Sequence, residues 1–182
     1  MTFDNQKWKS LTKESILVKK PWFEVFREEI QLPDGKVVPE YYEIQMPHYT
    51  AVFAVTVEHK IIVLRCYQHA IGEVTLTMPG GMIEESESPL AGIQRELLEE
   101  TGYKAKGWKP LGTFLGNSTR GCGTYHLFFS TGAYPVQEPY SGDLEELELL
   151  LWEKQEVEQA FDEGQVKSLG VASMLLLGLR CL

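Results

Sequence analysis

The sequence GGMIEESESPLAGIQRELLEETGY, from Gly80 to Tyr103, carries the strongest structural signal in this chain. Ser88 followed by Pro89 predicts the start of a helix, because a serine caps the first turn and proline has no N–H to lose there. Gly102 predicts the end of that helix, since glycine readily adopts the left-handed conformation that closes one. The stretch therefore predicts a helix that starts at Pro89 and ends at Gly102, after two glycines that let the backbone approach a ligand closely.

The predicted helix has an apolar surface and an acidic surface. Apolar residues recur at helical spacing and are expected to face a core: Leu90, Ile93 and Leu97. Three glutamates share another surface: Glu96, Glu99 and Glu100. Like charges four residues apart destabilise a helix by roughly a few tenths of a kcal/mol. A hard divalent cation, Mg²⁺ or alternatively Mn²⁺, would offset this repulsion because such ions prefer oxygen ligands.

The spacing of this stretch is G-x5-E-x7-R-E-U-x-E-E-x-G-U, in which U is a bulky apolar residue. The specified positions are Gly81, Glu87, Arg95, Glu96, Leu97, Glu99, Glu100, Gly102 and Tyr103. The pattern resembles the box of the Nudix hydrolase family, and it departs from it only where Tyr103 replaces the usual aliphatic residue. The resemblance implies an α/β fold, a Nudix-type α/β/α sandwich with a mixed sheet.

The resemblance also implies a metal site for hydrolysis of a pyrophosphate. Glu96 and Glu100 are the implied main ligands, with Glu99 close by and the carbonyl of Gly80 as a further ligand. Two Mg²⁺ ions held there could bind a pyrophosphate, neutralise its charge and generate a hydroxide nucleophile.

The remaining charged residues of the box are expected to support this site. Arg95 and Glu87 are interpreted as an ion pair that orients the metal-binding carboxylates. Glutamate-rich helix faces are more often plain solvated surface, and RELLEE alone would favour that explanation. The two glycines, the distant Glu87 and the helix cap favour the metal site instead.

The length and composition of the chain limit its function. Its 182 residues fit one ordinary domain with a modest accessory part. The net charge of −9 argues against a nonspecific nucleic-acid binder, which needs a basic face. Three widely spaced cysteines indicate no disulfide framework, so a reducing cytoplasm is expected. The sequence predicts no secretion signal and no membrane-spanning segment, and hence no membrane partner.

Strand patterns lie on both sides of the predicted helix. Residues 15–46 are predicted to form antiparallel strands with a turn at Pro33-Asp34-Gly35. Further strands are predicted at 50–57, 60–66, 75–78, 109–115, 124–130 and 147–152. Two more helices are predicted at 153–163 and 166–180, the second apolar nearly all round.

The order of these elements resembles the ADP-ribose (ADP-sugar) pyrophosphatase branch of the family, from about Val18 to Gly178. The resemblance rests on PWFEVFREEIQLPDG, KIIVLRCYQH, MPGGMIEESES and DLEELELLLWEKQEVEQAFDEGQV. It implies that residues 1–46 form a small N-terminal antiparallel β-sheet that pairs two subunits and helps to build the substrate pocket. Residues 47–182 would form the Nudix hydrolase domain. The alternative is a terminal arm with a packing role only.

The resemblance to this branch implies further catalytic and substrate-binding residues outside the box. Glu145, in the acidic loop before residue 147, is expected to act as the base or as an additional metal ligand, with Asp143 in reserve. The catalytic candidates are therefore Glu99, Glu100, Glu145 and Arg95. The substrate-binding candidates are Arg65, Gln68 and Arg120. Gln68 stands where the branch often has an arginine, which weakens the case for ADP-ribose itself more than the case for pyrophosphate hydrolysis.

The expected function is Mg²⁺-dependent hydrolysis of a nucleoside diphosphate linked to another moiety, ADP-ribose or another nucleotide sugar. The expected products are a nucleoside monophosphate and a sugar phosphate, and the expected assembly is a homodimer. The first alternative is a Nudix hydrolase acting on nucleoside triphosphates or dinucleoside polyphosphates. The second is a catalytically silent nucleotide-sugar-binding module, although such modules commonly lose a box glutamate and this chain keeps them all.

Overall fold

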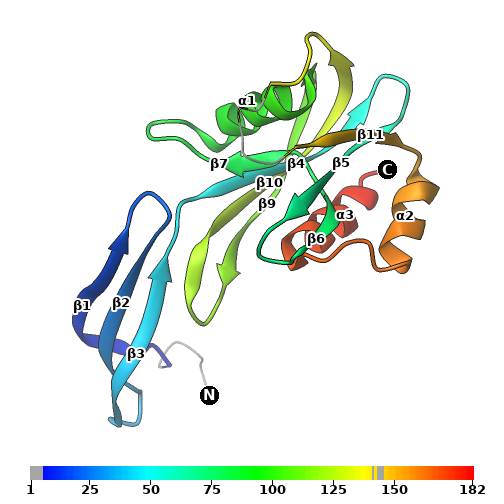
Figure 1. The fold of residues 1–182 in the computed structure, drawn as a ribbon. Coiled ribbons are helices and arrows are strands. Elements are labelled where there is room, and N and C mark those ends of the chain that lie inside the picture. Colours follow the sequence, from blue (N-terminus) through cyan, green and yellow to red (C-terminus); the bar gives the residue numbers. More distant parts are fainter. Residues whose placement is uncertain (1–5, 141, 143–145) are drawn as a thin grey trace. The chain divides into compact units, whose positions relative to one another are not determined.

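The computed structural model of the chain describes residues 6–140, 142 and 146–182 (Figure 1). The chain divides into two compact units. The first unit comprises residues 1–48 and 115–124, and the second comprises residues 49–114 and 125–182. The candidate base Glu145 and its reserve Asp143 lie outside the described residues.

The first unit is built on an antiparallel meander of three strands, which are β1 (Lys9–Lys19), β2 (Phe23–Gln31) and β3 (Val37–Gln45). The predicted antiparallel strands of this region are confirmed, but β1 starts six residues earlier than the predicted limit at residue 15. Every residue of β1 is exposed, and its sequence, KSLTKESILVK, shows no regular alternation of apolar and polar residues. Backbone pairing with β2 defines the strand instead.

The second unit contains a mixed sheet. Its strands are β4 (Tyr49–Thr56), β5 (Ile61–Gln68), β6 (Glu73–Thr77), β7 (Gly80–Met82), β8 (Tyr103–Lys104), β9 (Gly107–Asn117), β10 (Gly121–Pro135) and β11 (Glu148–Trp152), of which β9 and β10 extend into the first unit. β10 runs parallel to β4, whereas β5 pairs antiparallel with β4, β6 and β11. The expected mixed sheet is therefore confirmed.

The helices cover the two faces of this sheet (Figure 1). They are α1 (Pro89–Thr101), α2 (Lys154–Asp162) and α3 (Leu169–Leu179). Val52 and Ala54 of β4 pack in one core with α1, whereas Phe53 and Val55 pack in the other core with α2 and α3. Because successive side chains of a strand point to opposite faces, the sheet lies between the helices. The expected α/β/α sandwich is confirmed.

Two details of the helices differ from the predictions. Ile93 and Leu97 are completely buried, as expected, but Leu90 in the first turn of α1 is 39 % exposed. The last helix begins at Leu169 instead of residue 166. The carbonyl of Gln165 accepts hydrogen bonds from β6, including one of 2.9 Å from the hydroxyl of Thr75, and this contact keeps the preceding segment out of the helix. No helix among the described residues is long and apolar enough to cross a membrane.

Candidate active site

The helix that carries the glutamates has the ends that the sequence predicts. The hydroxyl of Ser88 accepts a hydrogen bond of 3.2 Å from the N–H of Ala91. Gly102 ends α1 in the left-handed conformation, with φ of 74°, and its N–H donates to the carbonyl of Leu98. These caps fix the length of α1 and therefore the positions of its side chains.

The two glycines before the helix allow close packing. Gly80 and Gly81 belong to β7, which pairs with β4. The N–H of Gly80 donates a hydrogen bond of 2.8 Å to a carboxylate oxygen of Glu100. A Cβ at Gly81 would lie 2.6 Å from the carboxylate carbon of Glu96. Only glycine leaves room for that carboxylate against the backbone of β7.

Arg95 is the centre of the charged network. Its Nε and Nη2 atoms each donate a hydrogen bond of 3.1 Å to one oxygen of Glu87. Its Nη1 atom donates to Glu96 at 2.9 Å and to Glu99 at 3.0 Å. Its Nη2 atom also donates to the carbonyl of Met82 at 3.0 Å. One guanidinium therefore holds three carboxylates and the end of β7 together.

The ion pair expected between Glu87 and Arg95 is thus present, and both groups are charged at neutral pH. The hydrogen bond from Arg95 lowers the pKa of Glu87 below its ordinary value, against the smaller opposing effect of burial. The hydrogen bond to Glu87, together with the charge of Glu96, raises the pKa of Arg95. The role of the pair in orienting metal ligands stays a prediction.

The donor groups of this site suit a hard divalent cation. Glu96 is buried, while Glu99 and Glu100 are half-buried on the same helix surface, and Gly80 adds a backbone carbonyl. All of these are oxygen donors, which Mg²⁺ and Mn²⁺ prefer. Within the described residues, however, no group of three His, Cys, Asp or Glu side chains stands in a metal-binding arrangement. The carboxylates point instead at Arg95 and at the N–H of Gly80.

Two predicted substrate contacts, Arg65 and Gln68, do not come together. They lie three positions apart on β5, and residues at that separation point to opposite faces of a sheet. Arg65 forms an ion pair of 2.9 Å with Glu148 of β11. The amide of Gln68 lies 3.6 Å from the sulfur of Cys66. Both stay predicted substrate contacts.

A cavity of about 530 Å³ surrounds the Arg65 side chain. Its lining residues come from β5, β6, β11 and the end of the acidic loop, and they are Arg65, Cys66, Tyr67, Val74, Glu146, Leu147 and Glu148. Glu148 is exposed, and its charge is balanced by Arg65.

Arg120, the third predicted substrate contact, belongs to the first unit. Its guanidinium lies 5.1 Å from the centre of the Tyr41 ring and donates a hydrogen bond of 3.1 Å to the carbonyl of Tyr42. The hydroxyl of Tyr41 in turn donates to the carbonyl of Thr119. These contacts tie the loop of Arg120 to β3, and a contact with substrate stays a prediction.

One segment beside the glutamates has no signal in the sequence. After β10, the N–H groups of Val136 and Gln137 donate to the carbonyl of Gly102 at 2.9 and 3.3 Å. The N–H of Tyr140 donates to the carbonyl of Glu99 at 2.7 Å. These contacts use backbone groups only, so no pattern of side chains in the sequence predicts them. They dock residues 136–140 on the last turn of α1.

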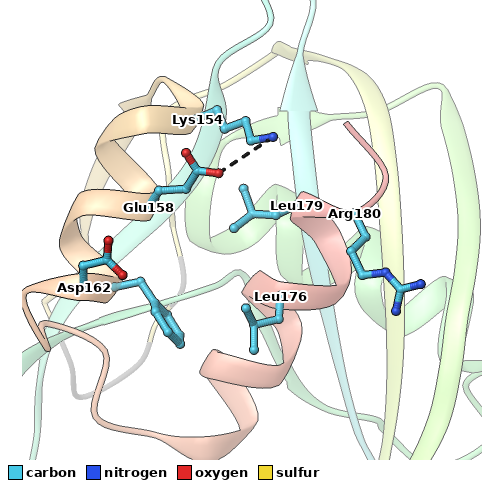
Figure 2. A pocket seen from close by; sticks show the side chains of 7 residues that line it. Lys154, Glu158, Asp162, Leu176, Leu179 and Arg180 are labelled. Carbon is cyan, nitrogen blue, oxygen red and sulfur yellow. Dashed lines mark ion pairs between the residues drawn. The ribbon is translucent and has the colours of Figure 1, made fainter.

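A second cavity, of about 490 Å³, lies between α2 and α3 (Figure 2). It is lined by Lys154, Glu158, Phe161, Asp162, Leu176, Leu179 and Arg180. Lys154 and Glu158 are 3.8 Å apart at its edge, which is the spacing of a weak surface ion pair. None of these residues belongs to the box, so this cavity is not part of the candidate active site.

The fold and the glutamate-bearing helix together define a Nudix-type protein. A family model described as the NUDIX domain matches residues 46–169, so the chain belongs to the Nudix family. A crystal structure of an ADP compounds hydrolase has the same fold, with a TM-score of 0.80 and 21 % identity, over 94 % of this chain and 92 % of that one.

Known relatives are similar over part of the chain. An ADP-ribose pyrophosphatase of Bacillus subtilis (strain 168) is 36 % identical over 98 residues, which are 54 % of this chain and 52 % of the relative. A methanol dehydrogenase activator of Bacillus methanolicus is 29 % identical over 105 residues, 58 % of this chain and 56 % of the relative. An ADP-sugar pyrophosphatase of Mus musculus is 42 % identical over 52 residues, 28 % of this chain and 24 % of the relative. The chain thus spans about half the length of the first two.

Proposed function

We propose that the protein is a Mg²⁺-dependent pyrophosphohydrolase that splits the pyrophosphate of a nucleoside diphosphate linked to a sugar, with ADP-ribose as the first substrate to test. The products would be a nucleoside monophosphate and a sugar phosphate. The observation that carries this proposal is the arrangement on α1, where Glu96 and Glu99 share Arg95 while Glu100 reaches Gly80. The similarity to an ADP-ribose pyrophosphatase supports the substrate class.

The proposed cation site consists of the Glu96, Glu99 and Glu100 carboxylates and the Gly80 carbonyl. A bound Mg²⁺, or Mn²⁺ as an alternative, would supply charge neutralisation for the pyrophosphate and would ionise an attacking water near neutral pH. The protein contributes the positions of these oxygens. Arg95 holds Glu96 and Glu99, and the N–H of Gly80 holds Glu100, so binding of a cation would require these carboxylates to turn partly away from these donors.

The proton of the attacking water needs an acceptor. We assign this role to Glu145, with Glu99 or Glu100 as the alternatives on the helix. Glu145 lies outside the described residues and is proposed from the resemblance of its acidic loop to the matching loop of ADP-ribose pyrophosphatases. Asp143 stays the reserve candidate in the same loop.

The substrate contacts that we propose outside the box come from β5 and from the first unit. Gln68 extends from the same face of β5 as Ile62, which packs in the core that contains α1, so Gln68 is favoured over Arg65 for a ligand at the box. Arg65 would then contribute through its cavity and its pair with Glu148. Arg120, in the first unit, stays a candidate for substrate binding.

Product analysis with a substrate panel tests the proposed function. The purified chain is incubated with Mg²⁺ and ADP-ribose, other nucleotide sugars, nucleoside triphosphates or dinucleoside polyphosphates in ¹⁸O-labelled water. The proposal predicts a nucleoside monophosphate and a sugar phosphate, with one label in one of the two products. Turnover of triphosphates or dinucleoside polyphosphates alone would select the first alternative. Tight binding of nucleotide sugars without any turnover would identify a silent binding module.

We also propose that residues 1–46 act as a dimerisation region, with residues 47–182 as the Nudix domain. β1 is an edge strand, and large apolar side chains on it are exposed, including Ile16, Leu17 and Val18. Such an edge can pair with a second copy of the chain. Light scattering should give a dimer at micromolar concentration, whereas a monomer would contradict this assembly. If a chain that lacks residues 1–46 stays fully active on nucleotide sugars, these residues do not help to build the substrate pocket.

We place this activity in the reducing cytoplasm. The support is the use of cysteine, since Cys66 lies in a buried strand and Cys122 and Cys181 are far apart in the sequence. Fractionation of cells that express a tagged chain tests this location, and recovery in a secreted or membrane fraction would contradict it.

A further inference from the structure

The last turn of α1 carries two of the proposed cation ligands at an unfavourable place. It comprises Leu98–Thr101, which includes Glu99 and Glu100 but no basic residue. The C-terminal end of a helix carries partial negative charge, so it repels glutamates, and helix ends fray. The side-chain bonds to Arg95 and to Gly80 hold the two carboxylates but do not pair the carbonyl groups of this turn. The backbone of the turn therefore needs donors from outside α1.

The five residues after β10 supply backbone donors to this end of the helix. The N–H of Tyr140 donates a hydrogen bond of 2.7 Å to the carbonyl of Glu99. The N–H groups of Val136 and Gln137 donate to the carbonyl of Gly102 at 2.9 and 3.3 Å. The last carbonyls of a helix have no partner within the helix itself. Three N–H groups of a segment distant in sequence therefore cap the C-terminal end of α1.

The backbone bonds, and not burial, hold this segment on the helix. All side chains of residues 136–140 are exposed, and that of Tyr140 is 80 % exposed. A segment that buries little apolar surface opens more easily than a packed one. The docking also needs room at Gly102, because a Cβ there would collide with the carbonyl oxygen of Gln137. The docked state therefore depends on a few N–H groups and on one glycine.

We propose that residues 136–140 are a positioning segment of the active site, whose N–H groups hold the last turn of α1 and with it the carboxylates of Glu99 and Glu100. This inference rests on the proposed cation site. When the segment undocks, the last turn frays, and the two glutamates lose the common geometry that a cation needs. The role belongs to the backbone of Tyr140, so another residue that keeps the N–H serves equally well.

Two variants of Tyr140 separate the backbone N–H from the ring. Proline removes the donor, whereas alanine keeps the donor and removes the ring. In Tyr140→Pro, the Mg²⁺ concentration for half-maximal activity should rise about three- to ten-fold, the range expected for loss of one hydrogen bond. The KM for ADP-ribose at saturating Mg²⁺ should stay unchanged. Tyr140→Ala should keep the Mg²⁺ dependence of the original protein, and equal losses in the two variants, or none in Tyr140→Pro, would overturn the inference.

Gly102→Ala displaces the segment in a different way. Its Cβ collides with the segment, and its backbone is also strained because Gly102 has a φ of 74°. Gly164→Ala is the matched control, because Gly164 has a φ of 71° but a Cβ there meets nothing within 4 Å. Gly102→Ala should weaken the response to Mg²⁺ at least as much as Tyr140→Pro, and the two changes together should add little to Gly102→Ala alone. A loss of the same size in Gly164→Ala would overturn the inference, since backbone strain would then explain the effect.

Hydrogen exchange of the metal-free protein tests the segment without the proposed reaction. The N–H of Gly102 donates to the carbonyl of Leu98 and therefore reports on the last turn of α1. Its exchange should be about three- to ten-fold faster in Tyr140→Pro and unchanged in Tyr140→Ala. A protein that hydrolyses no nucleotide sugar contradicts the proposed function, but its exchange rates still test the segment. Equal exchange at Gly102 in Tyr140→Pro and in the original protein would overturn the inference.

Discussion

Arg95 and Glu87 form a bidentate ion pair, in which two nitrogens of the guanidinium each lie 3.1 Å from one carboxylate oxygen. Glu87 precedes α1 and Arg95 lies in its second turn, so the pair clamps the helix to the segment before it. The remaining donors of Arg95 reach Glu96, Glu99 and the carbonyl of Met82. The spacing between Glu87 and Arg95 in the box therefore has a direct geometrical meaning.

Replacing Arg95 by lysine should lower both activity and metal affinity. Lysine keeps the charge but cannot hold Glu87 with two parallel hydrogen bonds while also reaching Glu96 and Glu99. We expect turnover and Mg²⁺ affinity to fall by about 10- to 100-fold, the range typical for residues that orient metal ligands. Arg27→Lys is the matched control, because Arg27 forms an exposed pair with Glu14 in the first unit. Equal kinetics for Arg95→Lys and the control would contradict the clamp.

The charge of Glu87 should make the stability of the protein depend on pH. Because the folded protein lowers the pKa of Glu87, its contribution is present above the unfolded pKa of about 4.3 and is lost as the pH falls through the folded pKa. Glu87→Gln removes this contribution. The difference in Tm between the original protein and the variant should be constant from pH 7 to 5 and should shrink below about pH 4. A difference that persists unchanged in acid would show that the charge of Glu87 contributes nothing.

Alanine at Gly81 should damage the site more than the fold. Its Cβ would lie 2.6 Å from the carboxylate carbon of Glu96, so that side chain must move. We expect turnover to fall at least about ten-fold, with a Tm close to that of the original protein. Gly170→Ala is the control, because a Cβ there meets nothing closer than 3.7 Å and favours α3. Full turnover in Gly81→Ala would show that turnover does not depend on the position of the Glu96 carboxylate.

Cys122, in the first unit, has a strained backbone conformation whose cost can be measured. Cys122 has a φ of 62°, between Gly121 and Gly123, which also have positive φ values. A non-glycine residue in this conformation costs roughly 1–2 kcal/mol, part of which glycine would lose again through unfolded-state entropy. Cys122→Gly should therefore stabilise the protein by up to about 1 kcal/mol in denaturant titrations. Cys122→Ala keeps the Cβ and should give no gain, and an equal gain in both variants would point to the thiol instead.

The parts of the structure that the sequence predicted are those with local signals. Ser88, Pro89 and Gly102 mark the ends of α1 through their own conformational preferences, and the alternation in β2 and β3 marks the hairpin around residues 33–35. The arrangement of the box residues was predictable to the same degree, because they lie on α1 and on the short stretch from β7 to its N-terminus.

The parts that were missed depend on contacts between distant segments. The first half of β1 is mostly polar and fully exposed, so its pairing with β2 defines it as a strand. The docking of Tyr140 on Glu99 uses backbone atoms that every residue has. The separation of Arg65 from Gln68 on β5 follows from the sequence, because successive residues of a strand alternate between its faces, and both stay predicted substrate contacts.

The dependence of turnover on Mg²⁺ tests the central claim, that the box glutamates bind the cation used in pyrophosphate hydrolysis. Turnover of ADP-ribose is measured after chelation and then along a Mg²⁺ titration, for the original protein, Glu96→Gln, Glu100→Gln and Glu163→Gln. Glu163 is an exposed glutamate after α2 and serves as the matched control. The account predicts no turnover without metal, a saturable rise with Mg²⁺, and a loss of about 100-fold or more in the two box variants only. Undiminished turnover in either box variant, or in the chelated original protein, would contradict it.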